Sequence, residues 1–283
     1  MSGKKYYAER KGLASNISLD FEKLRQAFFY IYKTLESKYY LQQAIGYVCV
    51  DAEDGYVQGR WGSNPKIFVL MELRNDSLWP ISSNIRNYSE SDLFTMIEFL
   101  HDHVSEPTKG QYHTWNDCGW HYYEFDQEVG QEEFRQQINR FLAVYDKGYN
   151  LTQGGEIQII PPSGMTPLIT QPIVTQDPQN IDERVDYAVR TYLHHSSGLQ
   201  EKKDAVRTLA DVLEYLQKSN IRFTKKDEGT LFQIINEFDI RHHRKNQQGV
   251  YDKELFYEWM FYTFLASIKL LVNYMLKTGQ QIP

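Results

Sequence analysis

The stretch "LFYEWMFYTFLASIKLLVNYML", residues 255–276, decides how the second half of this chain folds. Its apolar side chains occupy nearly every side of a helix, interrupted by Glu258, Lys269 and Asn273. A helix that is apolar all round must be covered on all sides, so it is either central to a bundle or part of a dimer interface. Its longest uncharged piece spans about half of a bilayer, which favours a buried or interfacial helix over a membrane span.

Three segments before this stretch also have helical periodicity. In "DERVDYAVRTYLHH" (182–195), apolar residues recur at helical spacing after an acidic first turn. The segment "LQEKKDAVRTLADVLEYLQK" (199–218) carries a wide apolar stripe, and "KKDEGTLFQIINEFDI" (225–240) follows it. Four helices with short connections predict a helical bundle in the C-terminal part.

The N-terminal part has a mixed pattern. Residues 19–36, 89–104 and 130–146 have the periodicity of amphipathic helices, and Ser89 is placed to cap the second of them. The run "KIFVLMELR" (66–74) fits a strand or a helix, because its length alone does not distinguish them.

The N-terminal part closes with "KGYNLTQGGEIQII" (147–160), where a Gly-Gly pair between two short alternating stretches predicts a β-hairpin. Residues 161–180 then carry five of the nine prolines and almost no charge, which predicts an extended linker. We therefore expect a mainly α protein with minor β structure, divided into an N-terminal domain (1–160), a linker (161–181) and a helical bundle (182–283).

The composition narrows the class of protein. The chain has 283 residues and a net charge of −6, so contact with phosphate must come from a local basic patch. Its two cysteines, Cys49 and Cys118, do not make a disulfide scaffold, and a reducing cytoplasm is expected. The polar N-terminus lacks the apolar stretch of a signal peptide, and we expect no membrane contact.

A basic cluster interrupts this acidic chain in "NEFDIRHHRKNQQ" (236–248). Cations offset the partial negative charge at a helix C-terminus, so one interpretation is a solvated helix end. The other interpretation is a phosphate site, because Arg offers a fixed fork of donors and His exchanges protons near neutral pH. The cluster consists of Arg241, His242, His243, Arg244 and Lys245.

These residue types suffice for RNA cleavage without metal or other cofactor. Arg241 would bind the scissile phosphate, and His242 or His243 would transfer protons to and from the ribose 2′-hydroxyl and the leaving oxygen. Asn236 and Asp239 precede Arg241 by three to five positions on the expected helix and would orient it. Arg244 and Lys245 would add contacts to RNA.

A four-helix bundle with an Asn/Asp–Arg–His cluster before its last helix resembles HEPN domains, found in many prokaryotic toxins and antiviral proteins. The resemblance implies a dimer and, in active members, a metal-independent ribonuclease built on Arg, a polar residue, a few more positions and His. Arg241 and His242 match the start of that motif. Residues 246–248 carry no His where the motif ends, and His243 is the nearest substitute.

A second resemblance concerns the N-terminal part. The segment "INRFLAVYDKGYNLTQGGEIQII" (138–160) is similar to the closing segment of an N-terminal domain in AbiJ-type abortive-infection proteins, and "YYAERKG" (6–12) looks like its opening. Taken together with the HEPN resemblance, this one implies phage defence, with RNA, a second copy of the chain and a further protein of the same system as partners. It assigns no catalytic residue to the N-terminal domain.

Two other sites compete with this assignment. Arg190 and His195 have four residues between them, which meets the HEPN spacing, but they lie on the first expected helix of the bundle and not at its last junction. The other candidate is a metal site of His113, Cys118 and His121, since zinc accepts His and Cys ligands.

The stretch 101–126 that contains those three residues matches no zinc-binding spacing, because it holds a single Cys. His101 and His103 are two apart on an expected helix, so they would not chelate together. Such a stretch is more often a packed aromatic loop, and a second use of its exposed rings and histidines is stacking on bases. In that interpretation its anchoring side chains are Trp115, Trp120, Tyr122 and Phe125.

A rival of another class is a non-catalytic regulatory bundle. It would dimerise through Trp259, Phe264 and their neighbours, with Arg241 only in structural hydrogen bonds. Several enzyme classes are not indicated, because the sequence has no P-loop, no Gly-rich dinucleotide fingerprint and no Gly-x-Ser-x-Gly elbow.

Overall fold

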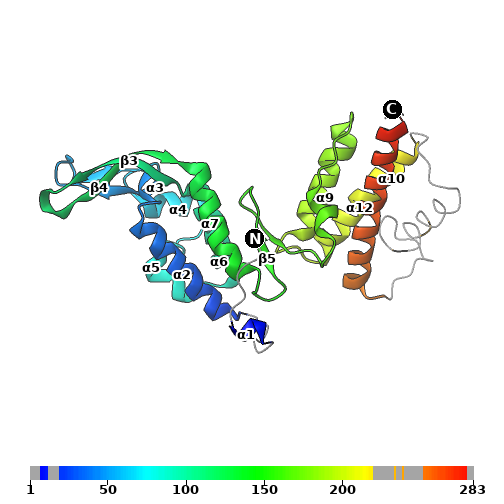
Figure 1. The fold of residues 1–283 in the computed structure, drawn as a ribbon, viewed down its shortest axis with the longest axis horizontal. Helices are drawn as coiled ribbons and strands as arrows, with labels where there is room; N and C mark the ends of the chain where they lie inside the picture. The colour runs from blue at the N-terminus through cyan, green and yellow to red at the C-terminus, as the bar shows by residue number, and fades with distance from the viewer. Residues whose placement is uncertain (1–6, 12–18, 219–232, 234–237, 239–250, 279–283) are drawn as a thin grey trace. The chain divides into compact units, whose positions relative to one another are not determined.

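A computed structural model describes residues 7–11, 19–218, 233, 238 and 251–278. The described residues form a mainly helical protein with small β-hairpins, which confirms the expected class. The chain divides into two compact units, residues 1–160 and 161–283 (Figure 1).

The first unit combines helices with three antiparallel hairpins, β1–β2, β3–β4 and β5–β6, among its described residues. Its helices are α1 (Tyr7–Arg10), α2 (Phe21–Ser37), α3 (Gln42–Ile45), α4 (Pro65–Leu73), α5 (Ile81–Asn84), the 3-10 helices η1 (Ile85–Asn87) and η2 (Trp115–Asp117), α6 (Glu90–His103) and α7 (Gln127–Leu142). Its strands are β1 (Gly46–Val48), β2 (Tyr56–Gln58), β3 (Glu106–His113), β4 (Gly119–Asp126), β5 (Tyr149–Leu151) and β6 (Ile157–Ile159).

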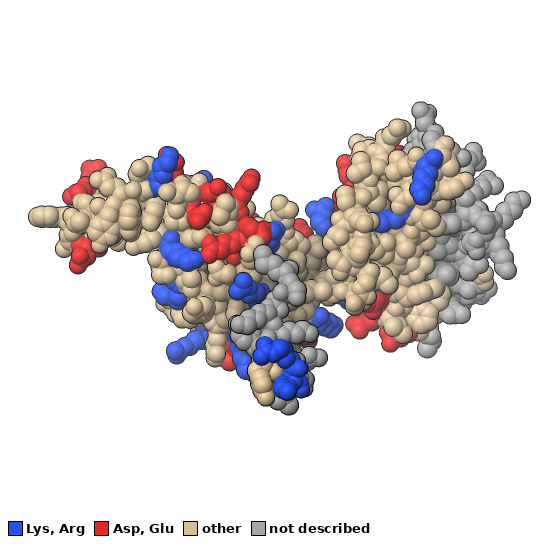
Figure 2. All heavy atoms as spheres, in the orientation of Figure 1, with Lys and Arg blue, Asp and Glu red and all other residues tan. Residues whose placement is uncertain are grey.

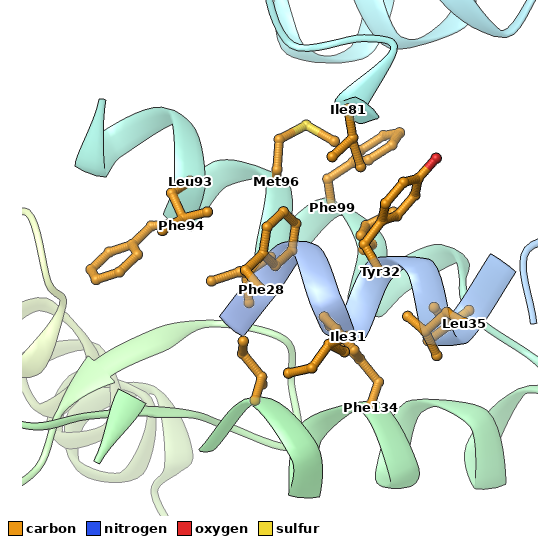
Figure 3. Close-up of a cluster of buried hydrophobic side chains, with 14 of the residues drawn as sticks. Phe28, Ile31, Tyr32, Leu35, Ile81, Leu93, Phe94, Met96, Phe99 and Phe134 are labelled. Atoms are coloured by element: carbon orange, nitrogen blue, oxygen red, sulfur yellow. The ribbon is translucent and has the colours of Figure 1, made fainter. Parts of the chain in front are cut away.

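Helices α2, α6 and α7 form the core of this unit. Apolar residues at helical spacing place Phe28, Ile31 and Leu35 of α2 in the interior. Figure 3 shows Phe28 on the side of Met96 from α6, and Ile31 on the side of Phe134 from α7. Burying a side chain such as Phe28 stabilises the folded state by roughly 1.5–3 kcal/mol. The hairpins extend from this stable helical core.

Two local expectations are settled by helix capping. Ser89 caps α6 and exchanges backbone and side-chain hydrogen bonds with Asp92, as the sequence indicates. The ambiguous run is helical over residues 66–73, because Asn64 accepts from the Ile67 N–H and Pro65 occupies the first turn.

The structure corrects the expectation of a packed loop within residues 101–126. Strands β3 and β4 pair in an antiparallel hairpin of eight residues on each side. The turn between them uses Asn116 and Asp117 with positive φ, which these residues tolerate better than most. Trp115 is 71% exposed, so it is not an anchor of a packed loop.

The second unit is built on three long helices among its described residues: α9 (Glu183–Leu193), α10 (Leu199–Lys218) and α12 (Lys253–Thr278). Their apolar stripes share one core, in which the rings of Tyr192 and Phe261 stack with centroids 4.0 Å apart. The helix expected over 225–240 lies almost entirely outside the described residues, so the expected four-helix arrangement stays a prediction.

The Pro-rich segment 161–181, expected as an extended linker, belongs to the second unit. It contains α8 (Thr166–Thr170) and most of the π-helix η3 (Pro178–Asp182). Ile173 and Ile181 are buried in the core of this unit, which ties the segment down. Composition alone did not indicate these two apolar anchors.

Helix α12 is long and apolar enough to cross a membrane by length and composition, a test that core helices also pass. Half of its most apolar window is buried inside the unit. Phe264 is fully buried there, so it does not form the interface expected of it, whereas Trp259 is 45% exposed.

Candidate metal centre

Four donor side chains come together where the hairpins β1–β2 and β3–β4 meet. Cys49 follows β1, His113 ends β3, Cys118 lies in the turn and His121 lies in β4. One ligand atom from each residue lies within 4.8 Å of the other three. Three of these residues were expected as a metal site, and Cys49 was not.

Strand pairing places the two histidines on one face of the β3–β4 hairpin. His113 pairs with Gly119, and Gln111 pairs with His121. Side chains two positions apart share a face of a strand, and paired residues share the same face. The two imidazole rings accordingly have centroids 5.1 Å apart.

The β1–β2 hairpin brings Cys49 to this face. The backbone N–H of Cys49 donates to the carbonyl of Gly55, which closes the loop after β1. At the start of β1, Gly46 has a φ of 101°, and an added Cβ would meet the carbonyl oxygen of Val57. A side chain at position 46 would therefore shift the strand that carries Cys49.

A buried glutamine fixes the β4 strand to the helical part of the unit. The side chain of Gln42 on α3 donates to the carbonyl of Trp120 at 2.8 Å and accepts from the N–H of Tyr122 at 2.7 Å. These two bonds imitate the pairing of a neighbouring strand on either side of His121.

The surroundings of His113 orient its imidazole. Its Nε2 lies 3.0 Å from Oδ2 of Asp51, while its Nδ1 lies 3.9 Å from Sγ of Cys49. A carboxylate on one ring nitrogen leaves the other nitrogen free to bind a metal, and this arrangement is common around zinc-binding histidines.

The imidazole of His121 is held by packing and not by a hydrogen bond at Nε2. Its ring stacks on Tyr47 with centroids 4.3 Å apart. Its Nε2 is buried and has no hydrogen-bond partner among the described residues. Burial, and to a smaller extent the neighbouring His113, lower the pKa of His121, which favours the neutral imidazole that binds metals. A buried nitrogen without a partner is costly, and a metal ion would satisfy it.

Two thiols and two imidazoles are the ligands of closed zinc sites. Zinc binds Cys at about 2.3 Å and His at about 2.0 Å in a tetrahedron, which places pairs of ligand atoms roughly 3.3–3.8 Å apart. The separations of at most 4.8 Å between the four donors are close to those values. Small side-chain rotations would therefore complete the tetrahedron, and the residues fit zinc.

The other histidines of this stretch take no part in the cluster. His101 is 3% exposed and lies beside Asp102, with its Nδ1 3.4 Å from Oδ1 of that residue. His103 accepts a hydrogen bond from the indole N–H of Trp61 at 3.2 Å. His101 and His103 thus have different neighbours, in agreement with the expectation that they would not bind one metal together.

The residues of the expected ribonuclease site lie outside the described part of the chain. Its competitor, the pair Arg190 and His195, is described: Arg190 is on α9, and His195 follows that helix with its ring stacked on His194. The residues outside the described part are Asn236, Asp239, Arg241, His242, His243, Arg244 and Lys245.

Cys49 is the functional residue that the sequence did not indicate. It lies 64 residues before His113, beyond any local spacing motif. A weak signal was present, because the chain has just two cysteines and the second was already a candidate ligand. No protein-family model, curated protein or solved structure matches this chain.

Proposed function

We propose that the first unit is a zinc-binding module in which Cys49, His113, Cys118 and His121 hold one structural Zn²⁺. The convergence of these four donors, one of them a buried nitrogen without a partner, carries the proposal. Four protein ligands leave no position for a substrate, so the ion fixes structure and does not act on a reactant.

The need for a metal follows from how the β3–β4 hairpin is held. None of the described residues that form the core of the first unit comes from β3 or β4. An isolated hairpin is marginally stable in water at best. Zinc would join this hairpin to the loop after β1 and would add to the two hydrogen bonds from Gln42.

Elemental analysis of the purified full chain tests this proposal. We expect about one zinc per chain, and tetrahedral thiolate bands in the visible spectrum when cobalt replaces zinc. Cys118→Ser and His121→Ala should lose the metal. His103→Gln, a change of another histidine of the first unit that lies outside this cluster, is the matched control and should retain it. A wild-type protein prepared with zinc present that contains no stoichiometric metal would end the proposal.

A second proposal concerns the helical bundle, which we infer to be a HEPN-like ribonuclease of the abortive-infection type. One observation supports it: Arg241, His242 and His243 lie in the chain between α10 and α12, which share one core. The motif of the resembling family occupies the same place, before the last helix. Arg241 would bind the scissile phosphate, and the two histidines would transfer protons.

Cleavage of RNA by the full chain in the presence of a chelator tests the second proposal. Arg241→Ala should abolish cleavage, or toxicity in cells, while the melting temperature stays nearly unchanged. Arg207→Ala on α10 serves as a control for loss of positive charge. A parent protein that cleaves no RNA, together with a large loss of stability in Arg241→Ala, would favour the rival regulatory module.

Both proposals are consistent with a cytoplasmic location. Cys49 and Cys118 are free thiols in the structure. Reduced thiols bind zinc as thiolates, and a reducing cytoplasm keeps them in that state. We therefore propose a cytoplasmic protein of a defence system, in which a partner protein would trigger the bundle.

A further inference from the structure

The two cysteines of the chain lie beside each other at the proposed zinc site, although they come from different hairpins. The Sγ atoms of Cys49 and Cys118 lie within 4.8 Å of each other. A disulfide needs these atoms about 2 Å apart, so an approach of less than about 3 Å separates the pair from a covalent link. The chain has no third cysteine that could compete for either partner.

Both cysteines lie in connecting segments and not inside a helix or strand. Cys49 begins the loop after β1, and Cys118 lies in the turn between β3 and β4. Neither residue belongs to the core of the first unit. The two thiols can therefore approach each other while the helical core stays in place.

The two thiols differ in their exposure to solvent. Cys118 is half-buried, whereas Cys49 is only 6% exposed. A dissolved oxidant therefore meets Cys118 first. Cysteines that sense oxidants are accessible and often lie next to a second cysteine that completes the disulfide, and Cys49 has the position of that second thiol.

The charges around the pair select the oxidant. Residues 46–59 and 110–126 contain no Lys or Arg. At the left end of Figure 2, where Figure 1 places the β3–β4 turn, the visible charged side chains are acidic. Such a surface repels anionic oxidants such as oxidised glutathione and admits uncharged hydrogen peroxide. Four exposed carboxylates lie in the two segments that carry the cysteines: Asp51, Glu53, Asp54 and Asp117.

We infer that Cys49 and Cys118 form a peroxide-sensitive switch, in which their oxidation to a disulfide expels the zinc ion of this site. The inference rests on the proposed zinc-binding function and adds a regulation to it. A disulfide offers no thiolate, so the ion would keep His113 and His121 alone, too few ligands for a structural zinc site. The covalent bond would then join the loop after β1 to the β3–β4 turn in place of the metal.

The reaction needs hydrogen peroxide and two protons from solvent. Sγ of Cys118 attacks one peroxide oxygen, the O–O bond breaks, and the other oxygen leaves as hydroxide and is protonated to water. Sγ of Cys49 then attacks the sulfenic sulfur of Cys118, the S–S bond forms, and the S–O bond breaks to release a second hydroxide, which also becomes water. The two sulfur atoms lose two electrons, and the peroxide gains them.

The switch is reversible in the proposed compartment. A reducing cytoplasm returns a disulfide to two thiols by thiol exchange. The four ligands would then be complete again, and zinc would rebind. Zinc occupancy would therefore follow the local concentration of peroxide.

Peroxide titration of the reduced, zinc-loaded full chain tests the switch. We expect one zinc released for each disulfide formed, measured with a colorimetric chelator, and a loss of two hydrogen atoms from the mass of the chain. Peptide mapping should find Cys49 joined to Cys118 of the same chain. A phosphine reductant followed by added zinc should restore the metal content. His103→Gln, the matched control outside the cluster, should respond as wild type does.

Single-cysteine variants test the order of the two steps. These variants are compared with metal-free wild-type chain, and the readout is the adduct of a sulfenic acid with dimedone. Cys49→Ser should accumulate the adduct at Cys118 at least about tenfold above wild type, because no second thiol consumes the sulfenic acid. Cys118→Ser should react more slowly, since Cys49 is buried. Equal labelling of wild type and Cys49→Ser would overturn the role of Cys49.

A charge reversal tests the choice of oxidant. The double variant Glu53→Lys with Asp54→Lys should raise the rate of zinc release by oxidised glutathione several-fold, because it removes the repulsion of that anion. The rate with hydrogen peroxide should stay within about twofold of wild type, because peroxide is uncharged. An unchanged rate with oxidised glutathione would overturn the electrostatic selection of peroxide.

The outcomes separate this inference from the zinc-binding proposal. A chain that keeps its zinc under peroxide, or that forms only sulfinic acids or disulfides between chains, overturns the switch and leaves the zinc module standing. A chain without zinc before oxidation overturns the zinc module. A disulfide between Cys49 and Cys118 in that metal-free chain would still support the thiol pair, and its absence would overturn the pair as well.

Discussion

Asp51 holds the imidazole of His113 from the side opposite Cys49, with its Oδ2 3.0 Å from Nε2 of the ring. Asp51 is exposed, so this contact alone adds little to folding stability in water. Its effect is to select the ring orientation in which Nδ1 faces Sγ of Cys49. The contact therefore links an exposed loop residue to the proposed metal.

Asp51→Asn should weaken zinc binding about 10- to 100-fold, as loss of outer-shell carboxylates does at other zinc sites. The fold should be retained, because the side chain of Asp51 is exposed. Competition with a colorimetric chelator measures the affinity. Asp54→Asn, an exposed change in the same loop, is the control and should leave the affinity unchanged. An unchanged affinity in Asp51→Asn would exclude an orienting role.

Removal of the metal should loosen the β3–β4 hairpin and leave the helical core intact. The reason is that the core of α2, α6 and α7 contains no residue of that hairpin among the described residues. Chelation should therefore change the fluorescence of the hairpin residues Trp115 and Trp120 while the far-ultraviolet circular dichroism of the helices persists. Simultaneous loss of both signals would show that the metal supports the whole unit.

Gln42→Ala should destabilise the first unit by about 1–3 kcal/mol, because it leaves the carbonyl of Trp120 and the N–H of Tyr122 without their partner. Urea unfolding followed by circular dichroism measures the change. Zinc affinity should fall as well, since His121 lies between the two freed groups. Gln26→Ala on the exposed side of α2 is the control, and its stability should stay within about 0.5 kcal/mol of wild type.

Stability should fall in acid in part because of His103. Burial chiefly lowers the pKa of His103 below its ordinary value of 6.5, and its Nδ1 accepts from Trp61 only when unprotonated. A depressed pKa in the folded state gives stability that is complete above the unfolded pKa and is lost as the pH falls through the folded pKa.

His103→Gln keeps an acceptor at this position and removes the titration. Its free energy of unfolding should therefore fall less than that of wild type between about pH 7.5 and about pH 5. Burial also lowers the pKa of His101, His121 and His195, and these contributions occur in both proteins and cancel in the difference. Parallel pH profiles for the two proteins would show that His103 does not contribute.

The long amphipathic helices could be predicted because their pattern is local. In α2, the spacing of Phe28, Ile31 and Leu35 specifies the buried face, and at α6 the cap at Ser89 marks the first turn. The β3–β4 hairpin could not be predicted in this way. Its strands are mostly exposed or half-buried on both faces, so they lack the regular alternation of a strand against a core.

The candidate metal centre was predictable only in part for the same reason. His113, Cys118 and His121 fall within nine residues, and their types alone suggested zinc. Cys49 joins them through the β1–β2 hairpin, a contact that no local spacing encodes. The exposed side of α12 was likewise ambiguous, since an all-apolar pattern does not distinguish the buried Phe264 from the exposed Leu270.

The position of Cys49 has a consequence for biosynthesis. This thiol leaves the ribosome 64 residues before His113, and helices α4 to α6 must be translated in between. A complete set of four ligands exists only once the turn and the start of β4 have emerged. Metal capture would therefore be a late event in the synthesis of the first unit, and the thiol of Cys49 would wait without its partner ligands throughout that interval, whatever the supply of zinc.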